Sequence, residues 1–483
     1  MTETYYNYIN GEWVASATGE LYKSINPADT EEVLGLFQQS NEDDVELAIA
    51  ASESAFGEWT DTPAPKRGNV LFKLIQLLEE QKEELAELIT KEVGKSLREA
   101  RGEVNKTIEA MKQFSGEATR LNGETAPSQN NNILGYTIRE PLGVVGVIAP
   151  YNFPLGIGIW KIAPAIIAGN TVVFKPASNT SLISVKIMEL FEQAGVPAGV
   201  INMVTGPGSA VGGAIGNHPK IQAVSFTGST DVGLALGKAV TARGAKMQAE
   251  MGGKNPAIIL EDADIDQAIE SIVISGFLDN GQRCTGTSRL IVPRTIAKEV
   301  TEKLVKRAER LVVGEGFGEN VDSGPVVDQN QLNTYLHYVD ISLKEGAKLE
   351  SGGKRLTDNG MDKGYFVAPT VFSNVTKDMT IFHEEIFGPV IAIIEVDTYE
   401  EALELANDSE FGLSSTIYTN DLKKAFHFVR KIESGVTHVN MPSTYFENQF
   451  PFGGKKASSM GPREQGSTAL DFWTDYKTVY INP

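Results

Sequence analysis

Cysteine is almost absent from this chain, because Cys284 is the only one among 483 residues. A disulfide needs two cysteines, so an internal disulfide framework is excluded, and a single thiol suits a reducing compartment. Residues 1–8 show neither the basic segment nor the apolar run of an export signal. The sequence therefore predicts a cytoplasmic protein without a disulfide.

Positive charge is also scarce. The chain carries 43 lysines and arginines against 63 aspartates and glutamates, which gives a formal net charge of −20. A surface of that charge repels phosphate groups, so nonspecific binding to nucleic acid or to an anionic membrane is disfavoured. We therefore expect neither nucleic acid nor a membrane as a partner.

No uninterrupted apolar run is long enough to cross a bilayer. Residues 143–169 come nearest to one. Prolines and polar residues interrupt this segment, at Pro150, Asn152, Pro154, Lys161 and Pro164. Proline disrupts the hydrogen bonding of a helix, and no asymmetry of basic flanks accompanies the run. The segment predicts a buried strand followed by a buried helix.

What the chain does contain is a regular alternation of strands and helices. Its length suggests roughly three domains of about 150 residues. Short strands are expected at 144–148, 171–175, 200–205, 223–226 and 246–250. Helical spacing follows each of the first four strands, which implies right-handed crossovers and a doubly wound parallel sheet. Such sheets bind ligands at the carboxyl ends of their strands.

Helices and strands are expected in the rest of the chain as well. Apolar spacing predicts helices over 42–58, 66–93, 96–121, 264–278 and 296–311, and strands over 289–292, 391–396 and 477–481. Asn41 is a suitable helix start and Gly94 a suitable helix stop. The fold class is therefore α/β.

The dinucleotide fingerprint G-x-G-x-x-G is missing from the turns of this sheet. Gly206, Gly208 and Gly212 fail its spacing by one residue. Gly228 and Ser229 open a predicted helix, whose N-terminus can accept a phosphate. For each of these glycines, a plain turn is an equally good interpretation.

The segment around Cys284 has the composition of a reactive site. Only a thiolate is a good nucleophile, and the adjacent Arg283 supplies a cation that favours that form. Gly281 lets the backbone approach a ligand. A lone cysteine is commonly a small buried apolar residue, but this polar run is a poor core segment. Glu250 offers a carboxylate within a mostly apolar stretch, so a nucleophile and a base are both present.

Seven short motifs, taken together, resemble those of the aldehyde dehydrogenase superfamily. They span most of the chain in order, at 151–154, 175–177, 226–229, 250–256, 281–284, 384–389 and 451–454. Among members of the superfamily, the pattern is most similar to the α-ketoglutarate (2-oxoglutarate) semialdehyde dehydrogenases. The resemblance implies oxidation of an aldehyde to a free carboxylic acid, with NADP or NAD as cofactor and no metal.

The resemblance also implies three structural parts. A doubly wound dinucleotide-binding domain would comprise residues 1–124 and 141–252, and an α/β catalytic domain residues 253–450. A small β oligomerisation arm with the C-terminal segment would comprise 125–140 and 451–483. Residues 133–139 alternate apolar and polar, as a strand that pairs with another chain would. We therefore expect a homodimer or homotetramer.

Four catalytic roles follow from the resemblance. Cys284 would add to the aldehyde, forming a thiohemiacetal and, after hydride transfer, a thioester. Asn152 would stabilise the oxyanion together with the backbone N–H of Cys284. Glu250 would activate water for thioester hydrolysis. Lys161 either tunes this proton path or merely closes a helix.

Cofactor residues are implied in the same way. They are Tyr151, Asn152, Lys175, Ser178, Gly228, Ser229, Met251, Glu385 and Phe387. Glu385 would hold the nicotinamide ribose and Lys175 the adenosine ribose. NAD-preferring members commonly carry an acidic residue at the position of Ser178, where its charge repels a 2′-phosphate. A neutral serine there either accommodates the phosphate or caps the following helix, so NADP is expected to be accepted. For Glu384 and Glu385, a solvated acidic pair is the alternative.

Substrate residues are implied at the wall of the pocket. They are Phe153, Ile157, Trp160, Arg283, Thr285 and Phe446. Arg283 could pair with the distal carboxylate of a semialdehyde. Succinate-semialdehyde enzymes commonly have arginine at the position of Trp160, so that substrate is an alternative, as is broad specificity. A cysteine-dependent thioesterase and a catalytically silent scaffold are the alternatives of another class.

Overall fold

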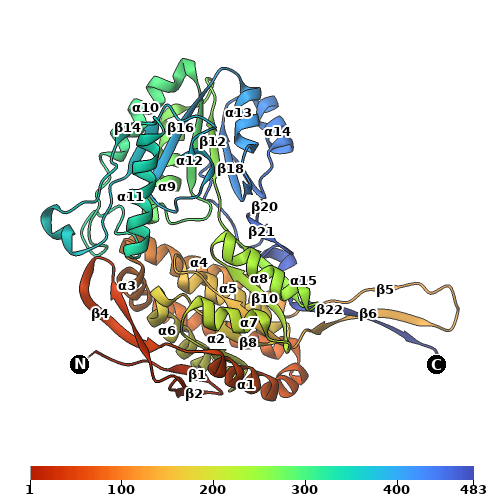
Figure 1. Cartoon of the computed structure of the whole chain (residues 1–483). Coiled ribbons are helices and arrows are strands. Elements are labelled where there is room, and N and C mark those ends of the chain that lie inside the picture. The colour runs from red at the N-terminus through yellow and green to blue at the C-terminus, as the bar shows by residue number, and fades with distance from the viewer. Residues whose placement is uncertain (1) are drawn as a thin grey trace.

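The computed structural model describes residues 2–483 and contains two α/β lobes and a projecting arm (Figure 1). The lower lobe in Figure 1 is built around an eight-stranded sheet and the upper lobe around a seven-stranded sheet. The arm extends sideways from the lower lobe. The predicted α/β fold class is confirmed.

The lower sheet has the predicted parallel strands at its centre. Its order is β2-β1-β9-β8-β7-β10-β11-β21, in which β9 to β11 are parallel and the edge strands antiparallel. The strands are β1 Asn7–Ile9, β2 Glu12–Val14, β7 Val144–Ile148, β8 Thr171–Lys175, β9 Ile201–Met203, β10 Ile221–Thr227, β11 Lys246–Glu250 and β21 Ser459–Met460. The chain order reverses between β7 and β10, which is where open α/β sheets bind ligands.

Helices cover both faces of this sheet. They are α1 Glu42–Asp61, α2 Ala64–Glu80, α3 Lys82–Val93, α4 Leu97–Glu117, α5 Pro154–Ile167, α6 Ser181–Gln193, α7 Gly213–Asn217 and α8 Thr230–Ala242. Asn41 and Asp44 form a capping box that starts α1, and Gly94 ends α3 with a φ of +88°, as predicted. The helix expected over 66–93 is wrong in one respect, because it is interrupted at Gln81, whose ψ of 15° leaves the helical region.

The apolar segment that resembled a membrane span is the centre of the lower lobe. Strand β7 is buried along its whole length, and α5 is buried except at Trp160. Pro164 is tolerated inside α5. Among residues 2–483, no helix is long and apolar enough to cross a bilayer. The predicted buried strand and buried helix are confirmed.

The upper sheet has the order β14-β15-β16-β13-β12-β18-β19 and is parallel except at β14. The strands are β12 Asn255–Ile259, β13 Thr287–Pro293, β14 Lys348–Ser351, β15 Thr370–Ser373, β16 Val390–Val396, β18 Ser414–Tyr418 and β19 Val436–Val439. The helices are α9 Ile265–Gly276, α10 Arg294–Ala308, α11 Gln329–Lys344, α12 Thr380–His383, α13 Tyr399–Asn407 and α14 Leu422–Lys431.

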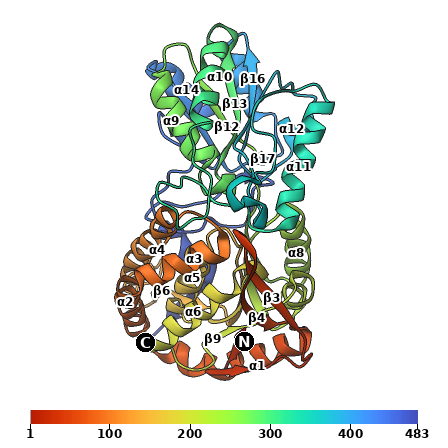
Figure 2. The same ribbon diagram turned by 90° about the vertical axis from the view of Figure 1, so that its left-hand side faces the viewer.

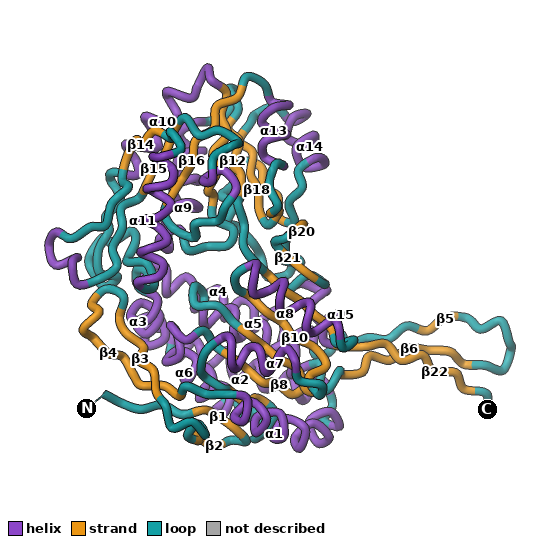
Figure 3. The backbone as a smooth tube through the Cα atoms, in the orientation of Figure 1, coloured by secondary structure: helices purple, strands orange, loops and turns teal. Residues whose placement is uncertain are grey.

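The arm is a three-stranded antiparallel ribbon (Figure 3). It consists of β5 Thr125–Ala126, β6 Leu134–Pro141 and β22 Thr474–Ile481. β6 pairs with β22 from Leu134↔Ile481 to Pro141↔Thr474. Within the chain, β6 thus pairs along its whole length with β22, but with β5 only at Gly135 and Tyr136. Pairing of this arm with another chain stays a prediction.

Two segments connect the lobes at positions far apart in sequence. A hairpin of β3 Leu21–Asn26 and β4 Asp29–Gln38 stands beside α3 and reaches the upper lobe (Figure 2). There Thr30 Oγ1 donates to the Lys363 carbonyl at 2.9 Å. Near the other end, β17 Phe411–Gly412 pairs with β20 Lys455–Lys456, after which β21 and α15 Ala469–Trp473 return to the lower lobe. The sequence did not predict β1 to β4.

Candidate active site

Cys284 lies on a turn that carries the chain from α9 back toward the lower lobe. The turn Leu278–Gly281 includes Asp279, Asn280 and Gly281 in succession with φ values of 48°, 56° and 65°. Asparagine and aspartate tolerate this left-handed region better than most residues. A Cβ on Gly281 would overlap the backbone of Gly388. The turn therefore requires glycine, and it directs the next residues, including Cys284, into the space between the lobes.

A cavity of about 770 Å³ opens at the carboxyl ends of the lower strands and ends at Cys284. It lies at the point of β7 and β10 where the strand order reverses. The predicted site residues that line it are Tyr151, Asn152, Ile157, Lys175, Gly228, Ser229, Met251, Cys284, Glu385 and Phe387. The remaining predicted residues are not part of this lining. They are Phe153, Trp160, Lys161, Ser178, Glu250, Arg283, Thr285 and Phe446.

The charges around Cys284 differ from the expectation. Burial, followed by the carboxylates of Glu385 and Glu250, raises the pKa of the Cys284 thiol to about 12. Arg283 was expected to favour the thiolate, but its guanidinium forms an ion pair with Asp279. The guanidinium still attracts the thiolate, but burial and the two carboxylates outweigh it, so the expected net lowering of the thiol pKa is absent. At neutral pH the thiol is protonated in this structure.

Asn152 lies on the loop between β7 and α5. Its side chain is buried, and Nδ2 donates to the Gln282 carbonyl at 2.9 Å, which ties the loop to the cysteine turn. The backbone N–H groups of Cys284 and Thr285 point at the sulfur and oppose the rise of its pKa. Thr285 is itself held by Ser443, whose Oγ donates to its carbonyl at 2.7 Å. Several N–H donors therefore converge close to the thiol.

Glu250 ends β11 and is buried on the other side of Cys284. Burial, then repulsion from Glu464, raises its pKa well above the ordinary value. Ser459 Oγ donates to Oε2 at 2.6 Å, whereas Oε1 has no hydrogen-bond partner. A Cβ on Gly453 would lie 2.6 Å from that free oxygen. One carboxylate oxygen is thus held in place, and the other is buried without a hydrogen-bond partner among residues 2–483.

Lys161 does not close a helix, because it lies in the middle of α5. Its side chain is 1% exposed, forms an ion pair with Glu464 and donates to Ser225 Oγ at 2.8 Å. Glu464 also accepts from Trp160 Nε1 at 3.0 Å. The interpretation of Lys161 as a helix end is therefore wrong, and the residue belongs to a buried chain of ionisable groups that leads to Glu250.

Glu385 faces the cavity from the upper lobe. Its Oε1 accepts from the Gly253 N–H at 2.9 Å, and burial raises its pKa to about 7. A Cβ on Gly252 would overlap the same carboxylate. Phe387 adopts a φ of 55°, and its ring lies 6.0 Å from that of Tyr151. The alternative of a solvated acidic pair is wrong for Glu385, although Glu384 is exposed.

Comparisons with known proteins agree with this geometry. The profile of the Aldehyde dehydrogenase family matches residues 13–479. The chain belongs to the aldehyde dehydrogenase family. It is 47% identical over 480 residues to the α-ketoglutaric semialdehyde dehydrogenase of Bacillus subtilis, covering 99% of this chain and 98% of that protein. It is 44% identical to the α-ketoglutarate semialdehyde dehydrogenase of Haloferax volcanii, covering 99% of each.

Among solved structures, the chain is similar to betaine aldehyde dehydrogenase from Staphylococcus aureus in complex with NAD+. The TM-score is 0.96 and the sequence identity 35%, and the match covers 99% of this chain and 95% of that one. The two lobes, the cavity between them and the arm are therefore an aldehyde dehydrogenase fold.

In this aldehyde dehydrogenase, the contacts of Ser178 differ from the expectation. Its hydroxyl donates to the Gly206 carbonyl at 3.1 Å, and it does not line the cavity. The N-cap of the following helix α6 is Thr180 and no side-chain cap bond is made there, so the interpretation of Ser178 as a helix cap is wrong. Lys175 lines the cavity but is buried, donates to the Pro176 carbonyl at 2.6 Å, and has its pKa lowered by burial to about 8.

An aromatic cluster lies outside the lining of the cavity. The Trp160 ring lies 6.2 Å from Phe446 and 6.4 Å from Phe452. Lys106 of α4 holds its ammonium 5.0 Å from the centre of the Phe446 ring, a cation–π distance. Two of the predicted substrate residues, Trp160 and Phe446, are thus brought together.

Several residues of this site were not found from the sequence. They are Lys95, Glu103, Lys106, Asp279, Ser459 and Glu464. Each is a common polar residue, and nothing in its local spacing distinguishes it from a solvated surface residue. Only Asp279 had a signal, because it lies four residues before Arg283.

Proposed function

We propose that this aldehyde dehydrogenase oxidises a carboxylate-bearing semialdehyde such as α-ketoglutarate semialdehyde to the free acid. The observation that carries the proposal is the placement of a thiol, N–H donors and a buried carboxylate around one end of a large cavity. Its similarity to α-ketoglutarate semialdehyde dehydrogenases over nearly the whole chain supports the choice of substrate.

In the first step, Cys284 Sγ releases its proton to water in the cavity and adds to the aldehyde carbon. The carbonyl oxygen becomes an oxyanion, which the backbone N–H of Cys284 and the second amide hydrogen of Asn152 can receive. An uncharged donor suits this role, because it stabilises the thiohemiacetal anion without trapping it as an ion pair. When bound, an oxidised nicotinamide would accept the hydride that leaves the same carbon, which would leave a thioester on Cys284.

Glu250 is the group that activates water in the second step. It takes one proton from a water molecule, whose oxygen forms a bond to the thioester carbon, and the C–S bond breaks to release the acid. A raised pKa makes a carboxylate a better base once it is ionised. The Lys161–Glu464 pair lies beside it and offers a route for the proton to leave.

The cavity residues fit a dinucleotide cofactor. Glu385 presents a carboxylate that can accept from ribose hydroxyls, and Gly252 leaves room that any side chain would fill. Gly228 and Ser229 precede the N-terminus of α8, which suits a pyrophosphate. Residues 1–124 and 141–252 would thus form most of the cofactor-binding domain, with 253–450 completing the catalytic side.

Lys106 is a better candidate than Arg283 for the distal carboxylate. Asp279 already neutralises the Arg283 guanidinium. The Lys106 side chain is 33% exposed and pairs at 3.1 Å with Glu109, which is 62% exposed. Exposed ion pairs contribute only about 0–1 kcal/mol, so a substrate carboxylate can replace Glu109 as the partner.

We further propose that the arm joins copies of this chain into a homodimer or homotetramer. It projects from the body, and its exposed apolar side chains are Leu134, Ile138, Tyr476, Tyr480 and Ile481. Isolated ribbons of few strands are marginally stable in water, so a covering partner would stabilise it. Light scattering during gel filtration tests this, and a monomeric mass would refute it.

The compartment of the proposed reaction is the cytoplasm. One free thiol, Cys284, with no second cysteine to pair with, suits a reducing environment. Cell fractionation followed by an assay of each fraction tests this assignment, and activity confined to a secreted fraction would refute it.

The function is tested with a panel of aldehydes. Purified protein is mixed with each aldehyde and with NAD or NADP, and absorbance of the reduced nicotinamide is followed. Semialdehydes carrying a carboxylate should exceed uncharged aldehydes of equal length in kcat/KM. Hydrolysis of an activated thioester without cofactor, in the absence of any cofactor reduction, would refute the dehydrogenase in favour of a thioesterase.

A further inference from the structure

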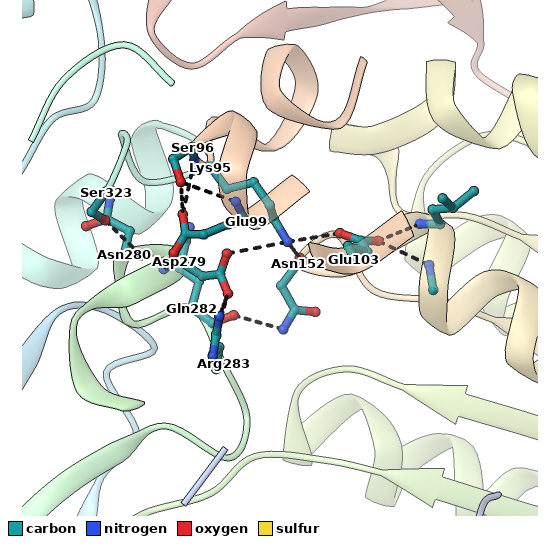
Figure 4. A network of polar contacts seen from close by, with 12 residues as sticks. Lys95, Ser96, Glu99, Glu103, Asn152, Asp279, Asn280, Gln282, Arg283 and Ser323 are labelled. Carbon is teal, nitrogen blue, oxygen red and sulfur yellow. Dashed lines mark hydrogen bonds and ion pairs between the residues drawn. The ribbon is translucent and has the colours of Figure 1, made fainter. Parts of the chain in front are cut away.

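A buried cluster of charged side chains joins α4 to the loops that carry Asn152 and Cys284 (Figure 4). It contains two cations and three carboxylates, namely Lys95, Arg283, Glu99, Glu103 and Asp279. None of these side chains was assigned a step in the reaction above. Their arrangement assigns one of them a role in positioning.

The Lys95 ammonium is at the centre of the cluster. Its Nζ donates to the backbone carbonyl of Asn152 at 2.7 Å and to Glu103 Oε2 at 3.0 Å. It lies 3.6 Å from Asp279 Oδ1 and 3.9 Å from the centre of the Phe153 ring. The side chain is 2% exposed. Lys95 therefore contacts both Asn152 and the residue that follows it.

Glu103 adds hydrogen bonds to the first turn of α5. Its Oε1 accepts the backbone N–H groups of Leu155 at 3.0 Å and Gly156 at 3.1 Å. These N–H groups belong to the start of a helix, where no intrahelical acceptor exists, and a carboxylate there also complements the helix dipole. Lys95 and Glu103 together hold residues 152–156, because Lys95 bonds to a backbone carbonyl and Glu103 to two backbone N–H groups.

Asp279 connects the same centre to the nucleophile. Its second carboxylate oxygen pairs with Arg283, next to Cys284, and its backbone N–H donates to Glu99 Oε1 at 2.6 Å. Asp279 itself has a left-handed backbone, a conformation that costs on the order of 1 kcal/mol and persists only where neighbours hold it. The turn is therefore held by the cluster.

Such a cluster is a poor device for stability alone. Desolvating ions costs several kcal/mol each, and well-packed apolar residues often do as well or better than a buried pair. What charged groups provide here is directional bonding to backbone atoms that an apolar core cannot hold. On the basis of the proposed function, we propose that Lys95 is a positioning residue that fixes Asn152 relative to Cys284 for stabilisation of the oxyanion.

The test is a double-mutant cycle between Lys95→Met and Asn152→Ala. Removing one oxyanion donor typically costs about 10²- to 10³-fold in kcat, and misplacing it costs on the order of 10- to 100-fold. If Lys95 acts through Asn152, adding Lys95→Met to Asn152→Ala should lower kcat/KM by no more than about 2-fold further. If the loss of kcat/KM in the double variant equals the product of the losses in the two single variants, the proposal is overturned.

Two further measurements distinguish a loss of positioning from a general loss of structure in Lys95→Met. Alkylation of Cys284 by iodoacetamide develops no oxyanion, so Lys95→Met should change its rate by less than about 3-fold, and the Kd for NAD should stay similar. Arg67→Met is the matched control, because Arg67 is also buried and bonds to backbone carbonyls, at Ile167, Thr60 and Thr62, away from the site. It should lower stability without lowering kcat. Equal loss of alkylation and oxidation in Lys95→Met would refute positioning.

Lys95→Met leaves Glu103 buried without its cation and could fail to fold. The double variant Lys95→Met with Glu103→Gln removes both charges while an amide oxygen still accepts from α5. It should fold and should still show the loss of kcat, because the Asn152 carbonyl has lost its donor. Full activity in this variant would overturn the proposal. Failure of the proposed function looks different, since wild type would then not oxidise aldehydes or Asn152→Ala would be fully active.

Discussion

The two sides of Cys284 are built in opposite ways. On the α4 side, the charges of Lys95, Glu103, Asp279 and Arg283 are paired. On the β11 side, Glu250 keeps one carboxylate oxygen without a partner, and burial raises its pKa. The paired side can hold geometry but has little capacity to exchange protons. Burial raises the pKa of the Glu103 carboxyl as well as that of Glu250, but Glu103 has Lys95 as an ion-pair partner. Glu250 has no ion-pair partner among residues 2–483, which suits it to exchange protons. The contrast separates the part of the site that positions from the part that reacts.

The largest effect is expected from replacing Cys284, the residue that lies between the α4 side and the β11 side. Cys284→Ala should reduce aldehyde oxidation to background, because it is the only thiol in the chain. Alanine fills most of its volume, so circular dichroism and cofactor binding should be unchanged. Turnover above background in the purified variant would contradict the assignment of the nucleophile.

Glu250→Gln tests the reactive side directly. The amide keeps the shape but cannot accept a proton, so steady-state turnover should fall by about 10²- to 10⁴-fold. Hydride transfer precedes hydrolysis, and reduced cofactor should therefore appear as a burst of about one equivalent per site. Glu302→Gln, an exposed carboxylate on α10, is the control and should behave like wild type. A variant without a burst and with normal turnover would remove Glu250 from the mechanism.

The pH dependence of thiol reactivity sharpens the comparison. A pKa of about 12 leaves Cys284 protonated at neutral pH, and the thiolate fraction rises with pH until the pKa is passed. Alkylation of the cofactor-free enzyme should thus accelerate about tenfold per pH unit between about pH 7 and 10, without the plateau near 8.5 of a free thiol. Glu385→Gln removes one opposing charge and should speed alkylation at fixed pH. A plateau near 8.5 would show that the carboxylates do not control the thiol.

Ser178 lies beyond both sides, so it should affect only the choice of cofactor. Wild type should accept NADP at least comparably with NAD, because no carboxylate stands at this position. Ser178→Glu should lower kcat/KM for NADP by about 10- to 100-fold and leave NAD nearly unchanged. Ser178→Ala, which adds no charge, is the control. Absence of NADP-linked activity in wild type would disprove the interpretation of Ser178.

The smallest effect concerns the substrate tail. Lys106→Met should reduce the preference for a charged over an uncharged aldehyde of equal length by about 10-fold. Arg283→Met should leave that preference unchanged, because Asp279 already neutralises Arg283. The ratio of kcat/KM for the two substrates measures both. A loss of the preference in Arg283→Met but not in Lys106→Met would show that the paired side also selects the substrate.

The sequence predicted regular structure better than it predicted the environment of the site. Strands β7, β8 and β11 were located to the residue. For β7 and β8 the reason is that strands buried on both faces are short, mainly apolar runs between clear turns. The three-residue strands β1 and β2 carry too little pattern to be found. The break at Gln81 was missed because the apolar spacing continues across it.

The charge partners were missed for a different reason. Lys95 meets Asn152 across 57 positions, and Lys161 meets Glu464 across 303. Local spacing carries no information about such pairs, since only the folded topology brings them together. Asp279 and Arg283 are only four positions apart, but they meet across a left-handed turn and not along a helix. The prediction that Arg283 activates the thiol failed for this reason.

The hydrogen bond between Ser459 and Glu250 joins residues 209 positions apart. Strand β21, which carries Ser459, completes the edge of the lower sheet against β11, so this edge closes only after a very long loop has been ordered. Loop closure over such a distance slows folding, and contacts of this kind form late. During refolding, helical content should therefore return before catalytic activity does. A nascent chain with both lobes partly folded would carry the thiol and the base before their environment exists, which keeps the nucleophile from acting early.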